Sequence, residues 1–147
     1  MPSATPYDQD FFTWTQEQAA ALRAGRFQAL DRLHLADEIA DMGRSEQRAL
    51  ASRLAVIIAH LLKLRVQVER TPSNEKSWHN SVATQRRQVQ RLLKKNPGLK
   101  NPDLLAEAME SAWDDGRDLA IRETGLDPER FPEDNPYRLE ELLPDSP

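Results

Sequence analysis

The strongest constraint on the fold is an apolar seam at heptad spacing between residues 50 and 68. Residues 54–62 inside it are apolar almost all the way round a helix, apart from His60. A helix with these two properties packs lengthwise against other helices and is buried on most sides. The seam therefore predicts the central helix of a bundle. Its members alternate at steps of four and three residues: Leu50, Leu54, Ile57, Leu61, Leu64 and Val68.

The seam continues toward the N-terminus through Leu35, Ile39 and Met42, which stay in nearly the same phase. Gly43 interrupts this stretch, and a glycine inside a helix costs about 1 kcal/mol relative to alanine. The periodicity outweighs this cost, so we expect one long helix over about 32–70. The sequence leaves open whether that helix is continuous or breaks at Gly43.

Three shorter helices complete the expected bundle. Helical spacing predicts them near 8–24, 75–95 and 102–124, and a glycine or proline follows each of them closely. The last helix has a small residue at every fourth position, which lets another helix approach closely. Those small residues are Ala108, Ala112, Gly116 and Ala120.

These patterns predict an all-α fold: an up-and-down helical bundle of about four helices, with one long central helix and an irregular, Pro-rich C-terminal tail. We expect a flexible N-terminal arm over 1–7 and a helical bundle domain over 8–126. Residues 127–147 are expected to form a C-terminal extension that packs on the bundle. The chain length suits one domain with a substantial core.

Composition excludes several classes of protein. The chain has no cysteine, so it forms no disulfide, thiolate metal site or cysteine nucleophile. Its longest apolar run is about nine residues, which is too short to cross a bilayer. The first residues lack the basic and apolar parts of a signal peptide. We therefore expect a cytoplasmic protein with no membrane contact.

Charge is segregated along the chain. Residues 60–100 carry ten Lys/Arg and two Asp/Glu, whereas residues 101–147 carry four and fourteen. The simplest interpretation is that a basic helix lies beside an acidic one. The sharper interpretation is a nucleic-acid contact, although a pI of about 5.4 and the lack of interleaved aromatic residues disfavour it. Its candidate residues form one stripe: Arg87, Arg91, Lys94 and Lys95.

Several short stretches stand out in order along the chain. They are Tyr7 to Trp14, Leu22 to Phe27, Asp37-Glu38-Ile39, Met42-Gly43, His60-Leu61-Leu62-Lys63, Ser77-Trp78, Gln85-Arg86, Glu123-Thr124-Gly125-Leu126, Phe131-Pro132 and Asn135-Pro136-Tyr137. In this order and spacing they resemble the bacterial family known as domain of unknown function 29, over about residues 7 to 143. The resemblance implies a small all-helical bundle and supplies no activity. Family members often have a cysteine where this chain has Asn135, so a thiol-based role is not open to it.

His60 is the main candidate for a buried polar site because it lies in the most apolar part of the chain. A buried imidazole needs hydrogen-bond partners for its ring nitrogens. On a straight helix Glu38 and His60 lie about 33 Å apart, so they share a site only if the chain folds back at Gly43. A carboxylate on another helix, such as Glu123, is easier to reach. The candidate partners are Asp37, Glu38, Asp114, Asp118 and Glu123.

A metal site is the weaker interpretation of the acidic segment that precedes Gly43. His34, Asp37, Glu38 and Asp41 have the spacing of one helical face, and such side chains can hold a divalent cation. Di-iron bundles, however, use Glu-x-x-His pairs, and this chain has none. Nucleotide-binding and hydrolase motifs are absent as well. We therefore expect a solvated acidic face, no metal and no cofactor.

The favoured function is a protein-interaction or structural and regulatory module. Its partner is expected to be another protein or a second copy of the same chain, which would form a homodimer. Two alternatives stay open: a metal-dependent or acid–base enzyme centred on Asp37, Glu38 and His60, and a nucleic-acid-associated regulator that uses the basic third helix. No motif decides whether the protein is an enzyme.

Overall fold

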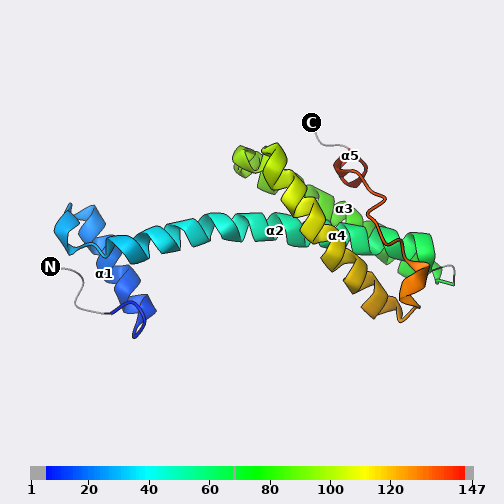
Figure 1. Ribbon diagram of the computed structural model, residues 1–147, viewed down its shortest axis with the longest axis horizontal. Helices are drawn as coiled ribbons and strands as arrows, with labels where there is room; N and C mark the ends of the chain where they lie inside the picture. Colours follow the sequence, from blue (N-terminus) through cyan, green and yellow to red (C-terminus); the bar gives the residue numbers. More distant parts are fainter. Residues whose placement is uncertain (1–5, 68, 145–147) are drawn as a thin grey trace. The chain divides into compact units, whose positions relative to one another are not determined.

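The fold is all-α, as the sequence predicts, and no strand occurs among the residues described by the computed structural model, 6–67 and 69–144 (Figure 1). Three single 3₁₀ turns connect the helices: η1 (Phe27–Ala29), η2 (Pro97–Lys100) and η3 (Pro128–Arg130). The α-helices are α1 (Phe11–Arg23), α2 (Arg32–Val66), α3 (Pro72–Lys95), α4 (Pro102–Thr124) and α5 (Leu139–Leu142).

The residues divide into two compact units, Met1–Ser45 and Glu46–Pro147. Helix α2 contributes its beginning to the first unit and the rest to the second. It is one helix of 35 residues, and Gly43 is helical within it. The predicted long helix is therefore confirmed as continuous. The expected domain bounds, 8–126 and 127–147, stay a prediction.

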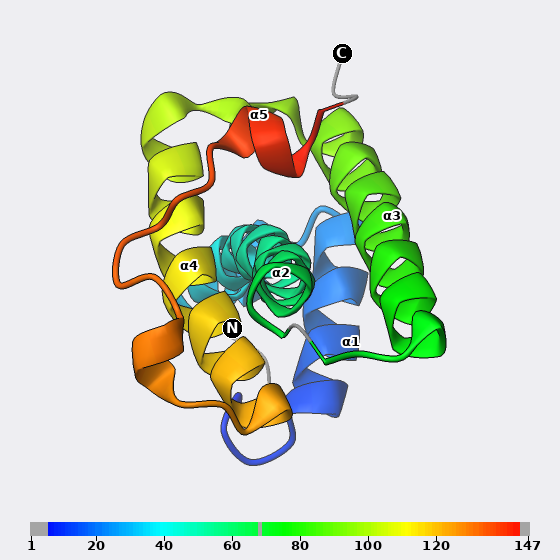
Figure 2. The same ribbon diagram turned by 90° about the vertical axis from the view of Figure 1, so that its right-hand side faces the viewer.

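The second unit is built around the apolar part of α2. This part lies between α3 and α4, and α5 lies across the side that those two helices leave open (Figure 2). Leu50, Leu54 and Ile57 of the seam are almost completely buried, while Leu61 and Leu64 are half-buried. Val68 lies outside the described residues. The seam thus identifies the core of this unit correctly.

At Gly116 the backbone of α4 lies very close to α2. A Cβ atom at this position would lie 2.7 Å from the carbonyl oxygen of Ala55 and 2.9 Å from Cγ2 of Ile58. These separations are shorter than van der Waals contact, so only glycine fits here. The row of small residues predicted from the sequence is buried along α4, which confirms its role in helix packing.

Local signals set the helix ends. Asp10 caps α1 by accepting a hydrogen bond from the backbone N–H of Thr13, and Asn101 caps α4 in the same way. Helix α3 begins at Pro72, three residues before the predicted start. The Thr71 hydroxyl accepts from Asn74 N–H, and Pro72 suits the first helical position. The Thr71-Pro72 pair therefore marks the start of this helix.

The first unit consists of α1, η1 and the beginning of α2. Its core is small: Trp14, Gln18 and Ala21 are its buried side chains among the described residues. Ile39 and Met42 continue the seam in sequence, yet they are 66% and 69% exposed. The expectation that this face is interior is wrong for these two side chains.

The two helical glycines give a matched test of packing. Gly116→Ala is expected to lower the free energy of unfolding by about 1–3 kcal/mol, because overpacking against α2 outweighs the gain in helix propensity. Gly43→Ala meets nothing within 4 Å and is expected to raise it by up to about 1 kcal/mol. Thermal and chemical denaturation followed by circular dichroism measure both. Stabilisation by Gly116→Ala would contradict the close approach of α4.

Candidate functional site

The residues considered for the polar site belong to two units. Asp37 and Glu38 belong to the first unit, whereas His60 and Glu123 belong to the second, together with Asp114 and Asp118. Gly43, the position at which the chain would fold back to form a shared site, is helical. Each pair is therefore described with its own surroundings.

Glu123 pairs with Lys63 rather than with His60. Lys63 is only 4% exposed, and its Nζ lies 2.7 Å from Oε2 of Glu123. The same ammonium group lies 5.8 Å from the ring centroid of Trp78 on α3, within the range of a cation–π contact. Three helices thus meet at one buried charge: α2 supplies the lysine, α3 the ring and α4 the carboxylate.

His60 lies one helical turn before Lys63 and is half-buried. Its Nδ1 is shielded from solvent and has no hydrogen-bond partner among the described residues. Burial lowers the pKa of the imidazole below its ordinary 6.5, and the charge of Lys63 lowers it further, whereas Glu123 acts in the opposite direction. The ring is therefore held neutral, which suits a structural histidine.

The sequence reasoning missed Lys63. The signal in the sequence was a lysine directly after the apolar run 54–62. In the structure this lysine follows the buried Ala59 by four residues, about one helical turn. Charged residues are almost never fully buried unless they are paired, so an acidic partner was to be expected. Periodicity alone assigns the position to an interior face and does not give the partner.

The first unit holds Glu38 in an aromatic and acidic network. The Tyr7 hydroxyl donates to Oε1 of Glu38, and this bond raises the pKa of Tyr7 to about 12. The Tyr7 ring stacks on His34 with centroids 4.1 Å apart. Asp31 Oδ2 accepts from Trp14 Nε1 at 3.1 Å and lies 2.7 Å from His34 Nδ1. This network ties the start of α2 to α1.

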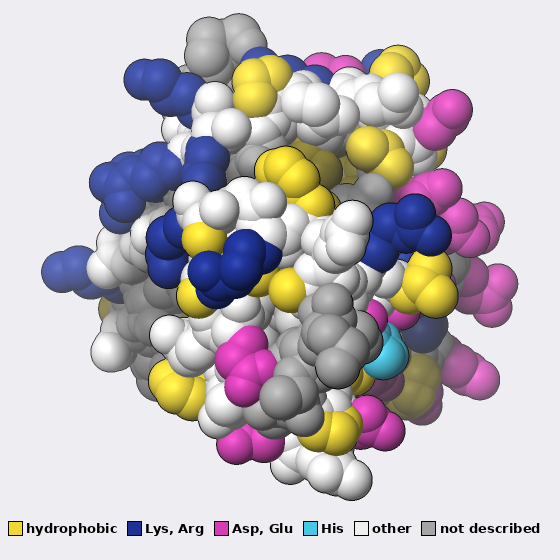
Figure 3. All heavy atoms as spheres, turned by 90° about the vertical axis from the view of Figure 1, so that its left-hand side faces the viewer, with side chains coloured by type: hydrophobic (Ala, Val, Ile, Leu, Met, Phe, Trp, Pro, Cys, Tyr) yellow, Lys and Arg dark blue, Asp and Glu magenta, His cyan; other side chains and the backbone are white. Residues whose placement is uncertain are grey.

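An apolar groove lies between α1 and the beginning of α2 in the first unit. It encloses about 370 Å³. Gln18 is fully buried at its edge and accepts from Asp31 N–H at 2.7 Å. Hydrophobic side chains reach the surface among charged ones on the face shown in Figure 3. The groove is lined by Phe11, Trp14, Thr15, Gln18, Ala19, Leu22, Leu35, Glu38, Ile39 and Met42.

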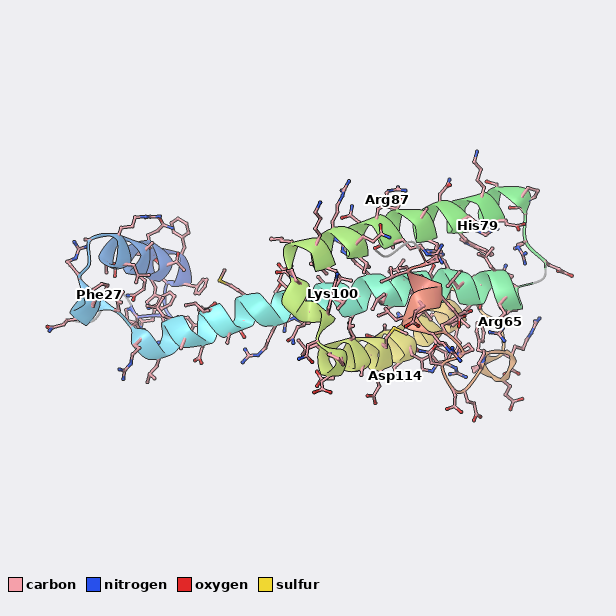
Figure 4. The ribbon with its side chains drawn as sticks, turned by 90° about the horizontal axis from the view of Figure 1, so that it is seen from above. Phe27, Arg65, His79, Arg87, Lys100 and Asp114 are labelled. Carbon is pink, nitrogen blue, oxygen red and sulfur yellow. The ribbon has the colours of Figure 1, made fainter. Side chains whose placement is uncertain are left out.

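The predicted basic stripe is exposed on α3. Figure 4 shows Arg87 on the side of α3 that faces away from α2. Arg87 donates to the Thr84 hydroxyl at 3.2 Å, and Arg91, Lys94 and Lys95 are also exposed. No aromatic side chain lies in the stripe. The four cations remain a prediction as an anion-binding surface.

Over residues 6–67 and 69–144, no three His, Asp or Glu side chains come close enough together to hold a metal ion. None of the helices in the same ranges has both the length and the apolar character that crossing a bilayer requires.

The geometry defines a small all-helical protein of two units: a helical hairpin of α1 and the beginning of α2, and a packed unit of the rest of α2 with α3, α4 and α5. Residues 6–146 match the family described as Domain of unknown function DUF29, and the chain belongs to this family. The resemblance found in the sequence is thereby confirmed. No curated protein and no solved structure matches the chain.

The Lys63–Glu123 pair predicts an asymmetry between its two partners. Glu123→Gln leaves a buried ammonium group without its counter-charge and is expected to cost about 1–3 kcal/mol of unfolding free energy. Lys63→Met keeps the volume and removes the charge, so its expected cost is smaller, within about 1 kcal/mol. Urea denaturation of both variants measures the difference. If Lys63→Met lowered the free energy of unfolding more than Glu123→Gln does, the ion pair would be a net source of stability.

The two described histidines with shifted pKa values predict opposite effects of pH. Asp31 raises the pKa of His34 above 6.5, so His34 stabilises the fold below 6.5 and loses this effect as the pH rises through its raised pKa. His60, with its lowered pKa, destabilises the fold as the pH falls below 6.5. His60→Gln should lose less stability on acidification than the wild type, and His34→Gln more. Denaturation at several pH values on both sides of 6.5 measures the free energy of unfolding of the wild type and of the two variants. The same pH dependence in all three proteins would refute both assignments.

Proposed function

We propose that this protein is a protein-interaction module that binds its partner through the apolar groove of the first unit. One observation carries the proposal: every large hydrophobic side chain that is strongly exposed in the described chain belongs to residues 11–42. They are Phe11, Phe12, Leu22, Phe27, Leu33, Ile39 and Met42.

Exposed apolar side chains gathered round a groove are typical of a binding surface, whereas single scattered ones are ordinary. Four of the seven line the groove: Phe11, Leu22, Ile39 and Met42. The groove walls are well packed from behind, since Trp14 is 1% exposed and bonded to Asp31. A preformed apolar groove between two helices suits a third helix, which lays its apolar face into it.

The other two functions have less support. The acid–base centre requires Glu38 and His60 in one place, and they belong to different units. The basic stripe on α3 offers charge without stacking side chains, so it provides only salt-sensitive contacts. We therefore propose a protein partner. We also propose the cytoplasmic location that the sequence led us to expect.

Site-specific photo-crosslinking tests the proposal. A benzophenone amino acid replaces Ile39 or Met42 in the groove, and Leu33 or Asp114 at exposed control positions outside it. After irradiation in the host cell, we expect a discrete protein adduct from 39 and 42 only. Adducts of equal yield from all four positions, or none from the groove positions, would contradict the proposal.

A further inference from the structure

The pattern of side chains on α1 indicates what occupies the groove. We infer that the occupant is a second copy of this chain, with α1 of each copy lying antiparallel in the groove of the other. The inference rests on the proposed function and names its partner. Three features of the hairpin support it: the size of the apolar surface, the shape of the α1 face and the order of charges along α1.

The apolar surface has the size that a stable interface needs. Phe11, Leu22, Ile39 and Met42 are 48%, 50%, 66% and 69% exposed. If each has a full surface of roughly 200 Å², they present on the order of 450 Å² together. A standard interface buries about 800 Å² per partner, of which a little over half is apolar. One groove from each copy therefore supplies the apolar share of such an interface.

The accessible part of the α1 face of the groove is small in the middle and large at both ends. Trp14 and Gln18 also line the groove but are buried, so the half-buried Thr15 and Ala19 are the accessible residues between Phe11 and Leu22. Two helices that cross at an angle are closest at the crossing point and diverge toward their ends. Small residues at the crossing and large ones beyond it are what an α1–α1 crossing needs. The face is thus self-complementary, as a two-fold contact requires.

The charges along α1 fit the same antiparallel register. Residues of α1 that face each other across a two-fold axis have numbers with a constant sum. With Thr15 opposite Ala19, the N-terminal end of one α1, which Asp8 precedes, lies at the C-terminal end of the other, which Arg26 follows. Asp10 and Arg23 then lie near each other as well. Glu17, which falls on the register centre, lies half a helical turn away from Thr15 and Ala19, so its two copies do not face each other. Unlike charges at both ends favour this orientation over the parallel one.

The first test is the association state of the full chain. Sedimentation velocity and light scattering over a concentration series are expected to show a dimer that dissociates on dilution. Ile39→Glu places a charge in the contact twice per dimer, so it should raise the dissociation constant by about a hundredfold or more. Leu33→Glu is the matched control on the same helix. Leu33 is 73% exposed and lies outside the groove, so this variant should dimerise like the wild type.

A charge exchange at the two ends of α1 tests the antiparallel orientation without altering the apolar groove. Asp8 and Arg26 are both exposed, so substitutions at either position are expected to leave the fold intact. Asp8→Arg and Arg26→Asp should each weaken the dimer by up to about tenfold, and the double variant should restore it. Circular dichroism checks that Ile39→Glu and the charge variants keep the wild-type helix content.

A wild-type protein that is monomeric at every concentration would overturn the second-copy inference. A dimer that Ile39→Glu leaves intact, or that the double charge variant fails to restore, would overturn this interface. The proposed function fails separately. If the monomer still forms a groove-specific adduct with a different protein in the crosslinking experiment, the groove binds that protein and the inference alone is wrong.

Discussion

The contact between α4 and α2 at Gly116 is the constraint on which the second unit depends. The α4 backbone approaches so closely that a single methyl group would meet the Ala55 carbonyl at 2.7 Å. The face of α2 that includes Ala55, Ile58 and Ala59 is buried. Two turns further along α4, the same approach brings Glu123 within hydrogen-bond distance of Lys63. The polar pair is thus a consequence of the apolar packing beside it.

The two parts of α2 have different surroundings. The part of α2 in the second unit lies among α3, α4 and α5 (Figure 2), and its seam residues Leu50, Leu54 and Ile57 are buried. The part in the first unit has α1 alone as its covering helix within that unit, and α1 covers one side. Apolar side chains with the same periodicity therefore become a core in one unit and a groove in the other. This difference is the physical basis for assigning the interaction to the first unit.

The sequence predicted the elements well because their signals are local. Gly125 ends α4 in a left-handed conformation with φ of 67°, and Asp10 starts α1. Periodicity was less informative about coverage: Leu50 and Ile39 belong to one apolar pattern, but 1% and 66% of their surface is exposed. Which helix covers a face depends on tertiary packing. The same limit applies to the polar site: the sequence suggested Glu123 as a partner of His60, whereas the ion pair that Glu123 forms is with Lys63.

Amide hydrogen exchange along α2 tests this account most directly, because it reads both parts of one helix in a single experiment. At low protein concentration, residues 50–66 are expected to exchange far more slowly than residues 33–44. Opening the first segment requires loss of the second unit's core, whereas the other segment is covered on one side within its unit. Equal exchange in the two segments, or faster exchange in 50–66, would contradict it.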